Sequence, residues 1–121
     1  MSYEYPRAKR ITRSSEFRTI LEKGRRVRAL DLDVRVLDSP LQYVRVGIIV
    51  PRHGHTAVAR NRLKRQLREL SRTLLLPASG SVDIVIRCRA SAFGRSFDEL
   101  RQQVLMVQRS FKMADSGGID V

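Results

Sequence analysis

Apolar residues in this chain recur with two different periods, and the alternation of these periods restricts the fold more than any other feature. Residues 82–88 are apolar at every second position, as in a strand with one buried face. Residues 63–74 instead carry leucines three or four positions apart, as in a helix with one buried stripe. A chain of 121 residues that mixes both patterns, with no dividing linker, predicts a single two-layer α+β domain.

Local signals place the elements of the N-terminal half. Ser14 or Ser15 can cap a first helix, which should end at Gly24. A possible short strand at 26–29 follows. Two alternating segments, 30–37 and 43–50, then predict two strands, and the sequence Asp-Ser-Pro between them predicts a turn. Residues 1–13 are basic and contain proline, so we expect an extended arm before the first helix.

In the C-terminal half, Thr56 is the expected N-cap of a helix over residues 57–75. A strand over 82–88 follows, and then a helix for which Ser96 and Glu99 provide a capping box. One face of this last helix should be apolar, with Leu100, Val104, Val107 and Phe111. The tail, residues 114–121, is short and polar and is expected to be flexible. The domain therefore spans residues 1–121.

The charge of the chain indicates its class of partner. Lys and Arg number 24 against 12 Asp and Glu, which gives a formal net charge of +12. Such an imbalance favours binding to nucleic acid. No apolar run of 18 residues and no hydrophobic N-terminal segment is present, so we expect a soluble, cytoplasmic protein without a membrane partner. Cys88 is the single cysteine and lies in an apolar strand, which predicts a buried thiol.

The helix over 57–75 carries most of its cations away from the leucine stripe. The face opposite Leu63, Leu67, Leu70 and Leu74 carries Asn61, Arg65, Arg68 and Arg72, while Arg60, Lys64 and Arg62 flank the stripe. Like charges four residues apart, such as Arg60 and Lys64, each cost a few tenths of a kcal/mol. A solvated face usually mixes both signs. This helix therefore predicts an anionic partner rather than plain exposure to solvent.

The sequence RNRLKRQLRE at residues 60–69 resembles the RNR signature of the bacterial ribonuclease P protein component. Three longer segments resemble the blocks around that signature in the same family. They are RITRSSEFRTILEKGRRVRA at 10–29, VGIIVPRHGHTAVARNR at 46–62 and VDIVIRCRASAFGRSFDELRQQV at 82–104. The resemblance thus covers nearly the whole chain, and the order of the blocks makes it specific.

The resemblance implies a small protein subunit of an RNA enzyme. In that family the catalytic RNA cleaves precursor tRNA to give the mature 5′ end, with Mg²⁺ held mainly by the RNA. The signature helix contacts the catalytic RNA, and a cleft between the first helix and the sheet holds the 5′ leader of the substrate. On this basis we expect RNA contacts from Arg60, Asn61, Arg62, Lys64, Arg65, Arg68 and Arg72. Phe17, Leu21, Arg35 and Arg52 are expected to lie along the leader cleft.

The family also implies a fold. Helices should pack on a mixed four-stranded sheet in the order αβββαβα, with a left-handed crossover between the last two strands. General physics favours the right-handed form in about 98% of such units, so here the resemblance overrides the base rate.

Two departures from the family pattern bear on the cleft. Leu21 and Arg35 stand where many members have aromatic residues, on which bases stack with ~1–3 kcal/mol each. The Arg35 guanidinium can itself stack on a base. The loop reads PRHGHT, with two histidines where other members often have a small polar residue and lysines, and Arg52 keeps one cation there.

Several residues allow a second interpretation. Phe17 shares an apolar face with Ile20 and Leu21, so it fits a core role as well as a cleft role. His53 and His55 lack the further ligands of a metal site, so a phosphate contact or a role in shaping the loop is favoured. Asp31 and Asp33 alternate onto one strand face, and we expect them to form a solubilising outer face rather than a metal-binding pair.

The chain lacks the constellation that protein nucleases use. The few acids are spread along the sequence and neither histidine lies near an acid, so no catalytic or metal-binding residue is expected in this chain. The main alternative to the ribonuclease P subunit is a ribosomal or other structural RNA-binding protein. A DNA-binding regulator is less favoured because no helix-turn-helix spacing is visible, and no DNA partner is expected.

Overall fold

A computed structural model describes residues 7–77 and 80–119, with side chains described through residue 110. Along the chain the elements are η1 (Arg7–Lys9), α1 (Ser14–Lys23), β1 (Arg25–Arg28), β2 (Leu32–Asp38), β3 (Arg45–Ile49), α2 (Ala57–Leu70), the π-helical turn η2 (Ser71–Leu75), β4 (Val82–Cys88), η3 (Ala90–Gly94) and α3 (Phe97–Ile119). The order αβββαβα is therefore confirmed, and the possible short strand is β1.

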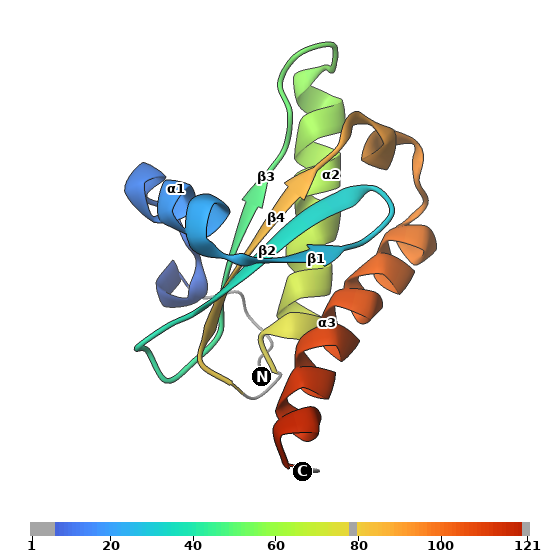
Figure 1. The fold of residues 1–121 in the computed structure, drawn as a ribbon. Helices are drawn as coiled ribbons and strands as arrows, with labels where there is room; N and C mark the ends of the chain where they lie inside the picture. The colour runs from blue at the N-terminus through green and yellow to red at the C-terminus, as the bar shows by residue number, and fades with distance from the viewer. Residues whose placement is uncertain (1–6, 78–79, 120–121) are drawn as a thin grey trace.

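The four strands form one mixed sheet in the order β1-β2-β4-β3. β2 pairs antiparallel with both β1 and β4, and β3 pairs parallel with β4. Helix α1 lies against one face of the sheet, and α2 and α3 lie against the other (Figure 1). The structure confirms the predicted α+β class with helices packed on a mixed four-stranded sheet.

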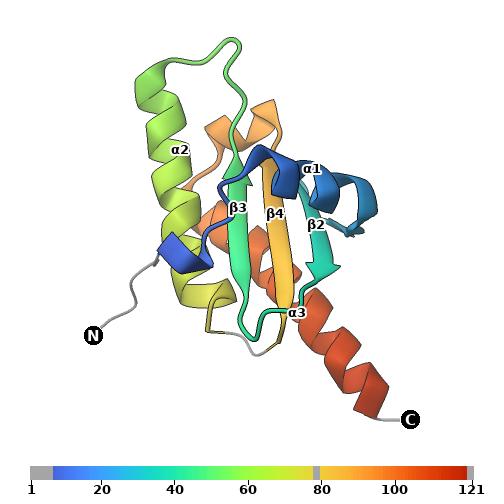
Figure 2. The same ribbon diagram turned by 90° about the vertical axis from the view of Figure 1, so that its left-hand side faces the viewer.

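β3, α2 and β4 form a parallel βαβ unit with a left-handed crossover. In Figure 2, α1 lies in front of the sheet and α2 behind it, both strands point upward, and β4 lies to the right of β3. Seen from the side of α2, β4 therefore lies to the left of β3. The crossover expected from the family is confirmed against the strong general preference for the right-handed form.

The sheet separates two apolar clusters of unequal size. The larger one packs α2 and α3 against the sheet through residues such as Leu67, Ile86 and Leu100, which are all fully buried. The smaller one lies under α1, where Ile11, Ile20 and Val85 are buried. Burying one such side chain contributes about 1.5–3 kcal/mol, so the larger cluster provides most of the hydrophobic stabilisation. Cys88 belongs to it, and burial raises the pKa of its thiol to about 12.

Two of the predicted helix caps are confirmed. The hydroxyl of Thr56 accepts a hydrogen bond of 3.0 Å from the amide of Ala59 at the start of α2. Before α3, the Ser96 amide donates to the Glu99 carboxylate and the Glu99 amide donates to the Ser96 hydroxyl, at 2.9 and 3.1 Å. These reciprocal bonds satisfy amides that have no partner inside the helix.

The start of α1 differs from the prediction. Arg13 occupies the N-cap position and makes no side-chain cap bond, so neither Ser14 nor Ser15 caps the helix. Gly24 does end α1, but in an extended conformation rather than a left-handed one. A Cβ at this position would lie 2.5 Å from the carbonyl oxygen of Ile20. Close approach of the chain to the last turn of α1 therefore requires glycine here.

The ends of other elements shift by a few residues. β2 starts at Leu32 rather than residue 30, and β3 covers only Arg45–Ile49 of the predicted 43–50. Val44 is nevertheless buried in the larger cluster. α3 continues to Ile119, into the segment 114–121 whose flexibility stays a prediction. Phe111 belongs to α3, but its side chain lies outside the described part. Within that part, no helix is both long and apolar enough to cross a membrane.

Asp31 and Asp33 do not form the exposed outer face predicted from their alternation. Asp31 is 1% exposed and Asp33 8% exposed. The carboxylate of Asp31 accepts hydrogen bonds from Ser91 at 2.6 Å, Gln103 at 2.6 Å and Arg95 at 2.7 Å. The expectation was wrong because the partners of Asp31 come from η3, α3 and the segment between them, and Asp33 binds Arg87 of β4. Only folding brings these distant residues next to the two acids.

The Asp31 network joins α3 to the start of β2. The side-chain oxygen of Gln103 accepts a hydrogen bond from the Asp31 amide at 2.8 Å, so both the backbone and the side chain of this residue bind Gln103. Burial by itself would raise the pKa of Asp31, but the hydrogen bonds from Ser91, Gln103 and Arg95 outweigh it and lower that pKa below 3.8. Asp31 is therefore charged in the folded protein at neutral pH.

Replacing Asp31 by Asn should lower the free energy of unfolding by about 1.5–3 kcal/mol, the range for hydrogen bonds to a charged group. An amide offers a single oxygen acceptor where the carboxylate serves Ser91, Arg95 and Gln103. Urea unfolding at pH 7 measures this loss. Asp38→Asn is the matched control, because Asp38 is exposed at the end of β2 and its replacement should change stability by less than about 0.5 kcal/mol.

The same pair of variants predicts a pH dependence. The folded-state pKa of Asp31 lies below its ordinary value of 3.8, so its stabilisation is fully present above pH 3.8 and is lost as the pH falls through the lower folded-state pKa. The gap in unfolding free energy between the wild type and Asp31→Asn should therefore narrow below pH 3.8. An Asp31→Asn loss at pH 7 no larger than that of Asp38→Asn contradicts the assigned role.

Candidate nucleic-acid interface

The exposed face of α2 carries cations that project away from the buried leucine stripe. Leu63, Leu67 and Leu70 are buried against the sheet. On the opposite face Asn61, Arg65 and Arg68 are exposed, and their side chains make no hydrogen bond or ion pair with any residue that the structure describes. Arg62 is exposed as well. The helix thus holds these side chains outward on a rigid support, where a polyanion can reach them.

Three other residues that were predicted to contact RNA are paired within the chain or partly buried. Arg72 lies in η2, just beyond α2, and its guanidinium binds both carboxylate oxygens of Glu69. Its charge is therefore partly balanced within the chain. Arg60 and Lys64 are half-buried at the edge of the leucine stripe, and the Arg60 Nε is buried without a hydrogen-bond partner among the described residues. RNA contacts from all seven predicted residues stay predictions.

Phe17 has features of both roles that the sequence allowed, packing in the core and lining the leader cleft. It is half-buried and packs against the smaller cluster under α1. Its ring rests on β3, where a Cβ at Gly47 would come within 2.6 Å of a ring carbon. Phe17 also lines a hollow of about 250 Å³, together with Lys64 and Arg68 from α2. The fold thus brings one predicted cleft residue beside two predicted residues of the signature helix.

The other predicted cleft residues are placed differently. Leu21 is half-buried in the smaller cluster, and its carbonyl oxygen accepts a hydrogen bond of 3.1 Å from Nη1 of Arg35. Arg35 is therefore tied to the last part of α1, with its side chain 23% exposed. Arg52 is exposed in the loop after β3 and does not line the hollow at Phe17. Their leader contacts stay predictions.

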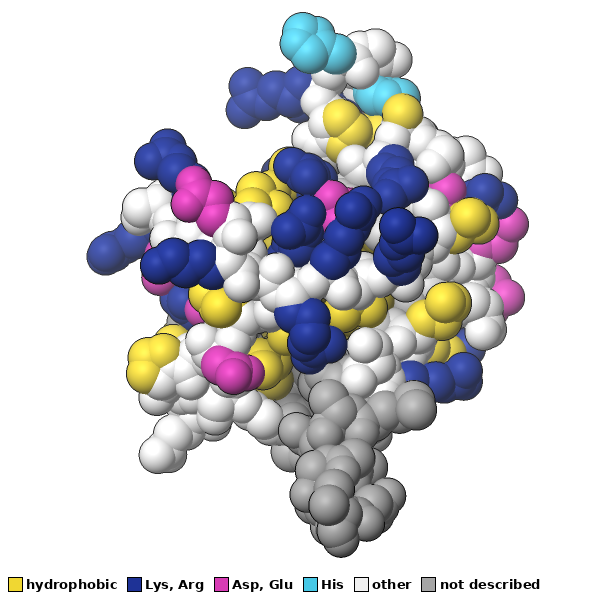
Figure 3. Space-filling model, viewed as in Figure 1, with side chains coloured by type: hydrophobic (Ala, Val, Ile, Leu, Met, Phe, Trp, Pro, Cys, Tyr) yellow, Lys and Arg dark blue, Asp and Glu magenta, His cyan; other side chains and the backbone are white. Residues whose placement is uncertain are grey.

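A second basic surface, which the sequence reasoning missed, lies on the face of the sheet that carries α1. It consists of Arg26, Arg28, Arg35 and Arg87, and we call it the sheet arginine patch. Strand register sets it: Arg28 and Arg87 flank Asp33 across β1, β2 and β4, and Arg26 lies opposite Arg35. Figure 3 shows basic side chains gathered around an acidic one over the region of β1 and β2.

Asp33 anchors this patch. Nη2 of Arg87 donates a 2.8 Å hydrogen bond to Asp33, while Nε of Arg26 and Nε of Arg35 lie 3.5 Å from its other oxygen. Burial would raise the pKa of Asp33, but Arg87 first, and then Arg26 and Arg35, lower it. One buried charge thus orients three guanidinium groups, and the patch remains strongly cationic. The alternation of Arg26 and Arg28 in β1 was the available signal in the sequence.

The loop that leads into α2 is held by an aromatic contact. The rings of His55 and Phe93 stack with centroids 3.6 Å apart and planes 5° apart. This contact joins the loop before α2 to η3, so it supports the role in shaping the loop that was considered for His55. His53 is exposed at the tip of the same loop.

These surfaces are suited to binding and offer little for acid–base chemistry. Of the described acids, Glu16, Asp31, Asp33, Glu69, Asp83 and Glu99 all bind arginine side chains. No three His, Cys, Asp or Glu side chains lie together as a metal site within residues 7–77 and 80–110. Cations therefore dominate the exposed chemistry of both candidate surfaces.

Comparison with known proteins agrees with this arrangement. The family model described as Ribonuclease P matches residues 5–112. A ribonuclease P protein component from a Pseudanabaena species is 36% identical over 97 residues, which cover 78% of this chain and 84% of that protein. One from Acidothermus cellulolyticus is 34% identical over 97 residues, covering 78% of this chain and 81% of that protein.

Two solved structures show the same fold. The RNase P protein from Thermotoga maritima is 26% identical and superimposes with a TM-score of 0.74, covering 84% of this chain and 96% of that one. The RNase P protein from Staphylococcus aureus is 25% identical, with a TM-score of 0.71 and coverage of 89% and 96%. The family match spans the exposed face of α2, the hollow at Phe17 and the sheet arginine patch. This chain belongs to the ribonuclease P protein family.

Proposed function

We propose that this chain, as the protein subunit of ribonuclease P, binds the catalytic RNA through the exposed face of α2. The observation that carries this proposal is that Asn61, Arg65 and Arg68, opposite a buried leucine stripe, are exposed and have no partner among the residues that the structure describes. Charge-assisted bonds to phosphate would convert the mutual repulsion of these cations into attraction. The complex acts in the cytoplasm and removes the 5′ leader of precursor tRNA.

We further propose that the 5′ leader runs between α1 and the sheet. Phe17 supplies a half-exposed ring beside Lys64 and Arg68, and the sheet arginine patch supplies guanidinium groups in a row across three strands. Aromatic rings that stack on bases, combined with cations that follow the backbone, are the usual means of binding single-stranded RNA. Leu21, Arg35 and Arg52 border this path.

Catalysis is proposed to reside in the RNA subunit, with Mg²⁺ held mainly by that RNA. The described residues do not fit a protein-held Mg²⁺, which prefers several oxygen ligands. Asp31 and Asp33 are buried and bound to arginines, and no cluster of three potential ligands is present in the described part of the chain. The role of this chain is to position RNA rather than to transfer protons.

Reconstitution with the cognate RNA subunit and a precursor tRNA tests this function. At low Mg²⁺ the protein should stimulate cleavage at the mature 5′ end, because its cations reduce the repulsion between substrate and catalytic RNA. Cleavage is measured on 5′-labelled substrate. The protein without RNA should cleave nothing, and Mg²⁺-dependent cleavage by RNA-free protein would overturn the proposal. Co-purification with ribosomal particles instead of one large RNA would favour the structural RNA-binding alternative.

Replacing both Arg65 and Arg68 by Ala should weaken binding to the RNA subunit without unfolding the protein. Each lost phosphate contact should reduce the slope of log affinity against log salt by about one. Filter binding across a salt series measures the slope. Arg101→Ala/Arg109→Ala removes the same charge from exposed positions on α3 and is the matched control. Equal effects of the two double variants would show that only net charge matters.

Replacing Phe17 by Leu separates the cleft role from the packing role. Leucine keeps apolar contact with Gly47 but cannot stack on a base, which is worth ~1–3 kcal/mol. The assembled enzyme should therefore bind precursor tRNA more weakly by that amount, with its affinity for mature tRNA unchanged. Phe97→Leu, at an exposed aromatic residue of α3, is the control. Equal losses for both tRNAs together with a lower Tm would assign Phe17 to packing alone.

A further inference from the structure

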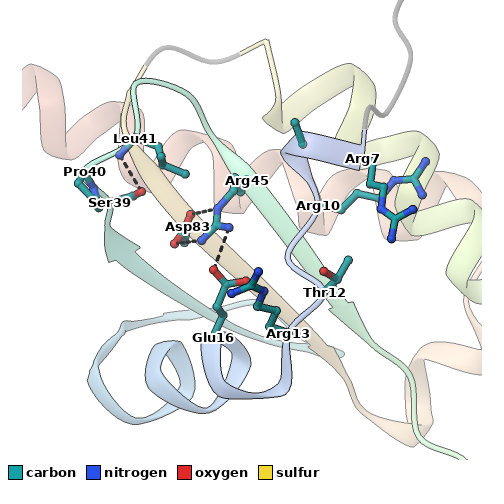
Figure 4. Close-up of a pocket in the computed structure, with 11 residues that line it drawn as sticks. Arg7, Arg10, Thr12, Arg13, Glu16, Ser39, Pro40, Leu41, Arg45 and Asp83 are labelled. Atoms are coloured by element: carbon teal, nitrogen blue, oxygen red, sulfur yellow. Dashed lines mark hydrogen bonds and ion pairs between the residues drawn. The ribbon is translucent and has the colours of Figure 1, made fainter.

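A third basic site lies at the other end of β3 from the α2 loop. It is a pocket of about 810 Å³ between η1, the start of α1 and the turn that joins β2 to β3. Arg7, Arg10, Arg13 and Arg45 line it, together with two acids, Glu16 and Asp83 (Figure 4). The pocket is large enough for a nucleotide, and its lining includes no residue of α2 or of the sheet arginine patch.

The two acids of the pocket are already occupied. Arg45 donates to both carboxylate oxygens of Asp83 at 2.9 and 2.8 Å and to Glu16 at 3.1 Å. The hydrogen bond with Asp83 is the main reason that the pKa of Arg45 is raised, so its charge is permanent. These bonds hold α1 against the beginning of β3 and β4. The three side chains form the floor of the pocket. Glu16 and Asp83 could bind another arginine of the pocket only by giving up their hydrogen bonds with Arg45.

The rim of the pocket is cationic and partly unpaired. The side chains of Arg7 and Arg13 are exposed and make no ion pair or hydrogen bond with any described residue. In Figure 4 Arg13 points toward Glu16 and Arg45, while Arg7 and Arg10 lie side by side on the outer rim. Four arginines against two acids leave the lining with a net charge of +2. The pocket therefore attracts an anion.

The rest of the lining suits more than a bare anion. Thr12 and Ser39 provide hydroxyl groups, and Ala8, Pro40 and Leu41 provide apolar surface. Guanidinium groups match phosphate oxygens, hydroxyls can bind a ribose, and apolar surface can contact a sugar or base face. This combination fits a nucleotide unit of single-stranded RNA.

The pocket also continues the path of the leader. It shares Arg10 and Thr12 with the hollow at Phe17, and the amide of Ile11, between those two residues, donates to the carbonyl oxygen of Val46 at 3.1 Å. Arg45 precedes Gly47, the residue under Phe17, by two positions, or about 7 Å along β3 at the usual rise per residue. A strand of RNA that leaves the Phe17 ring toward the start of β3 therefore reaches this pocket within a short step.

We propose that the pocket at Arg7, Arg10, Arg13 and Arg45 is a subsite for single-stranded RNA that binds leader nucleotides next to those at Phe17. The inference rests on the proposed function, because it extends the leader path beyond Phe17. Arg7 and Arg13 contact the phosphates, and Arg45 acts as a positioning residue that holds the floor. A phosphodiester of the RNA subunit has the same chemistry, so the experiment must separate the two sources.

The test uses the assembled enzyme with Arg7→Ala/Arg13→Ala and precursor tRNAs whose leaders differ in length by single nucleotides. In the wild type, affinity should rise at the leader length that first fills the pocket. In the double variant that rise should be lost, and the salt slope for long leaders should fall by about 1.4, or about 0.7 for each contact to a single strand. Affinity for mature tRNA and for the RNA subunit should stay unchanged.

Arg101→Ala/Arg109→Ala again controls for net charge, and Tm values verify that both variants are folded. Two results would assign the pocket to the RNA subunit and overturn the proposal. One is that the double variant binds mature tRNA and precursor tRNA more weakly by the same factor. The other is that the double variant loses affinity only for the RNA subunit. An unchanged leader-length profile in the double variant, or no rise with length in the wild type, would also overturn it. The proposed function itself would fail in a different measurement, in which the wild-type protein does not stimulate cleavage of precursor tRNA.

Discussion

Burial of β4 on both of its faces is the constraint on which the rest of the structure depends. Ile84 and Ile86 enter the larger cluster under α2 and α3, while Val85 enters the smaller one under α1. β4 also pairs with β2 on one side and with β3 on the other. A strand buried in this way needs helices on both faces of the sheet. The two RNA-binding surfaces proposed here follow, because α2 and α1 are the helices that cover those faces.

The chain has a net charge of +12. The positions of its acids stabilise the fold and still leave exposed arginines unneutralised. Asp31, Asp33 and Asp83 are buried, and each binds arginine side chains that come from other elements. Breaking such a pair leaves an uncompensated charge, which is strongly unfavourable. The acids therefore join elements to one another inside the fold. Arg62, Arg65 and Arg68 of α2 face solvent, and none of the described acids binds them.

Arginine serves two purposes in this molecule, and the difference is visible in its partners. Arg45 and Arg95 are structural, because each binds a buried carboxylate and holds a helix or a turn against the sheet. Arg65 and Arg68 are exposed and have no partner among the described residues. Arg35 and Arg87 combine the two roles, since Asp33 orients them while part of each side chain stays open to solvent. The sheet arginine patch thus combines a stabilising ion-pair network with the proposed binding of RNA.

Periodicity and capping signals in the sequence were sufficient to predict most of the helices and strands. The leucine stripe of α2, the alternation in β4, the Thr56 cap and the Ser96–Glu99 capping box all appear as expected, because each depends on residues close together in the sequence. The exposed face of α2 was predicted for the same reason. The mixed four-stranded sheet and the left-handed crossover came from the family resemblance. The order of the strands within the sheet, β1-β2-β4-β3, was not predicted, since local periodicity carries no information about it.

The sequence by itself determined the element types, the amphipathic signature helix and the basic character that indicates RNA. Only the tertiary structure decided what the charged residues of the sheet do. Alternation predicts one shared face for Asp31 and Asp33, but Asp31 precedes β2, and the burial of each acid depends on a side chain more than 50 positions away, Gln103 for Asp31 and Arg87 for Asp33. The same holds for the hollow at Phe17 and the pocket at Arg13, which form where segments distant in the sequence pack together.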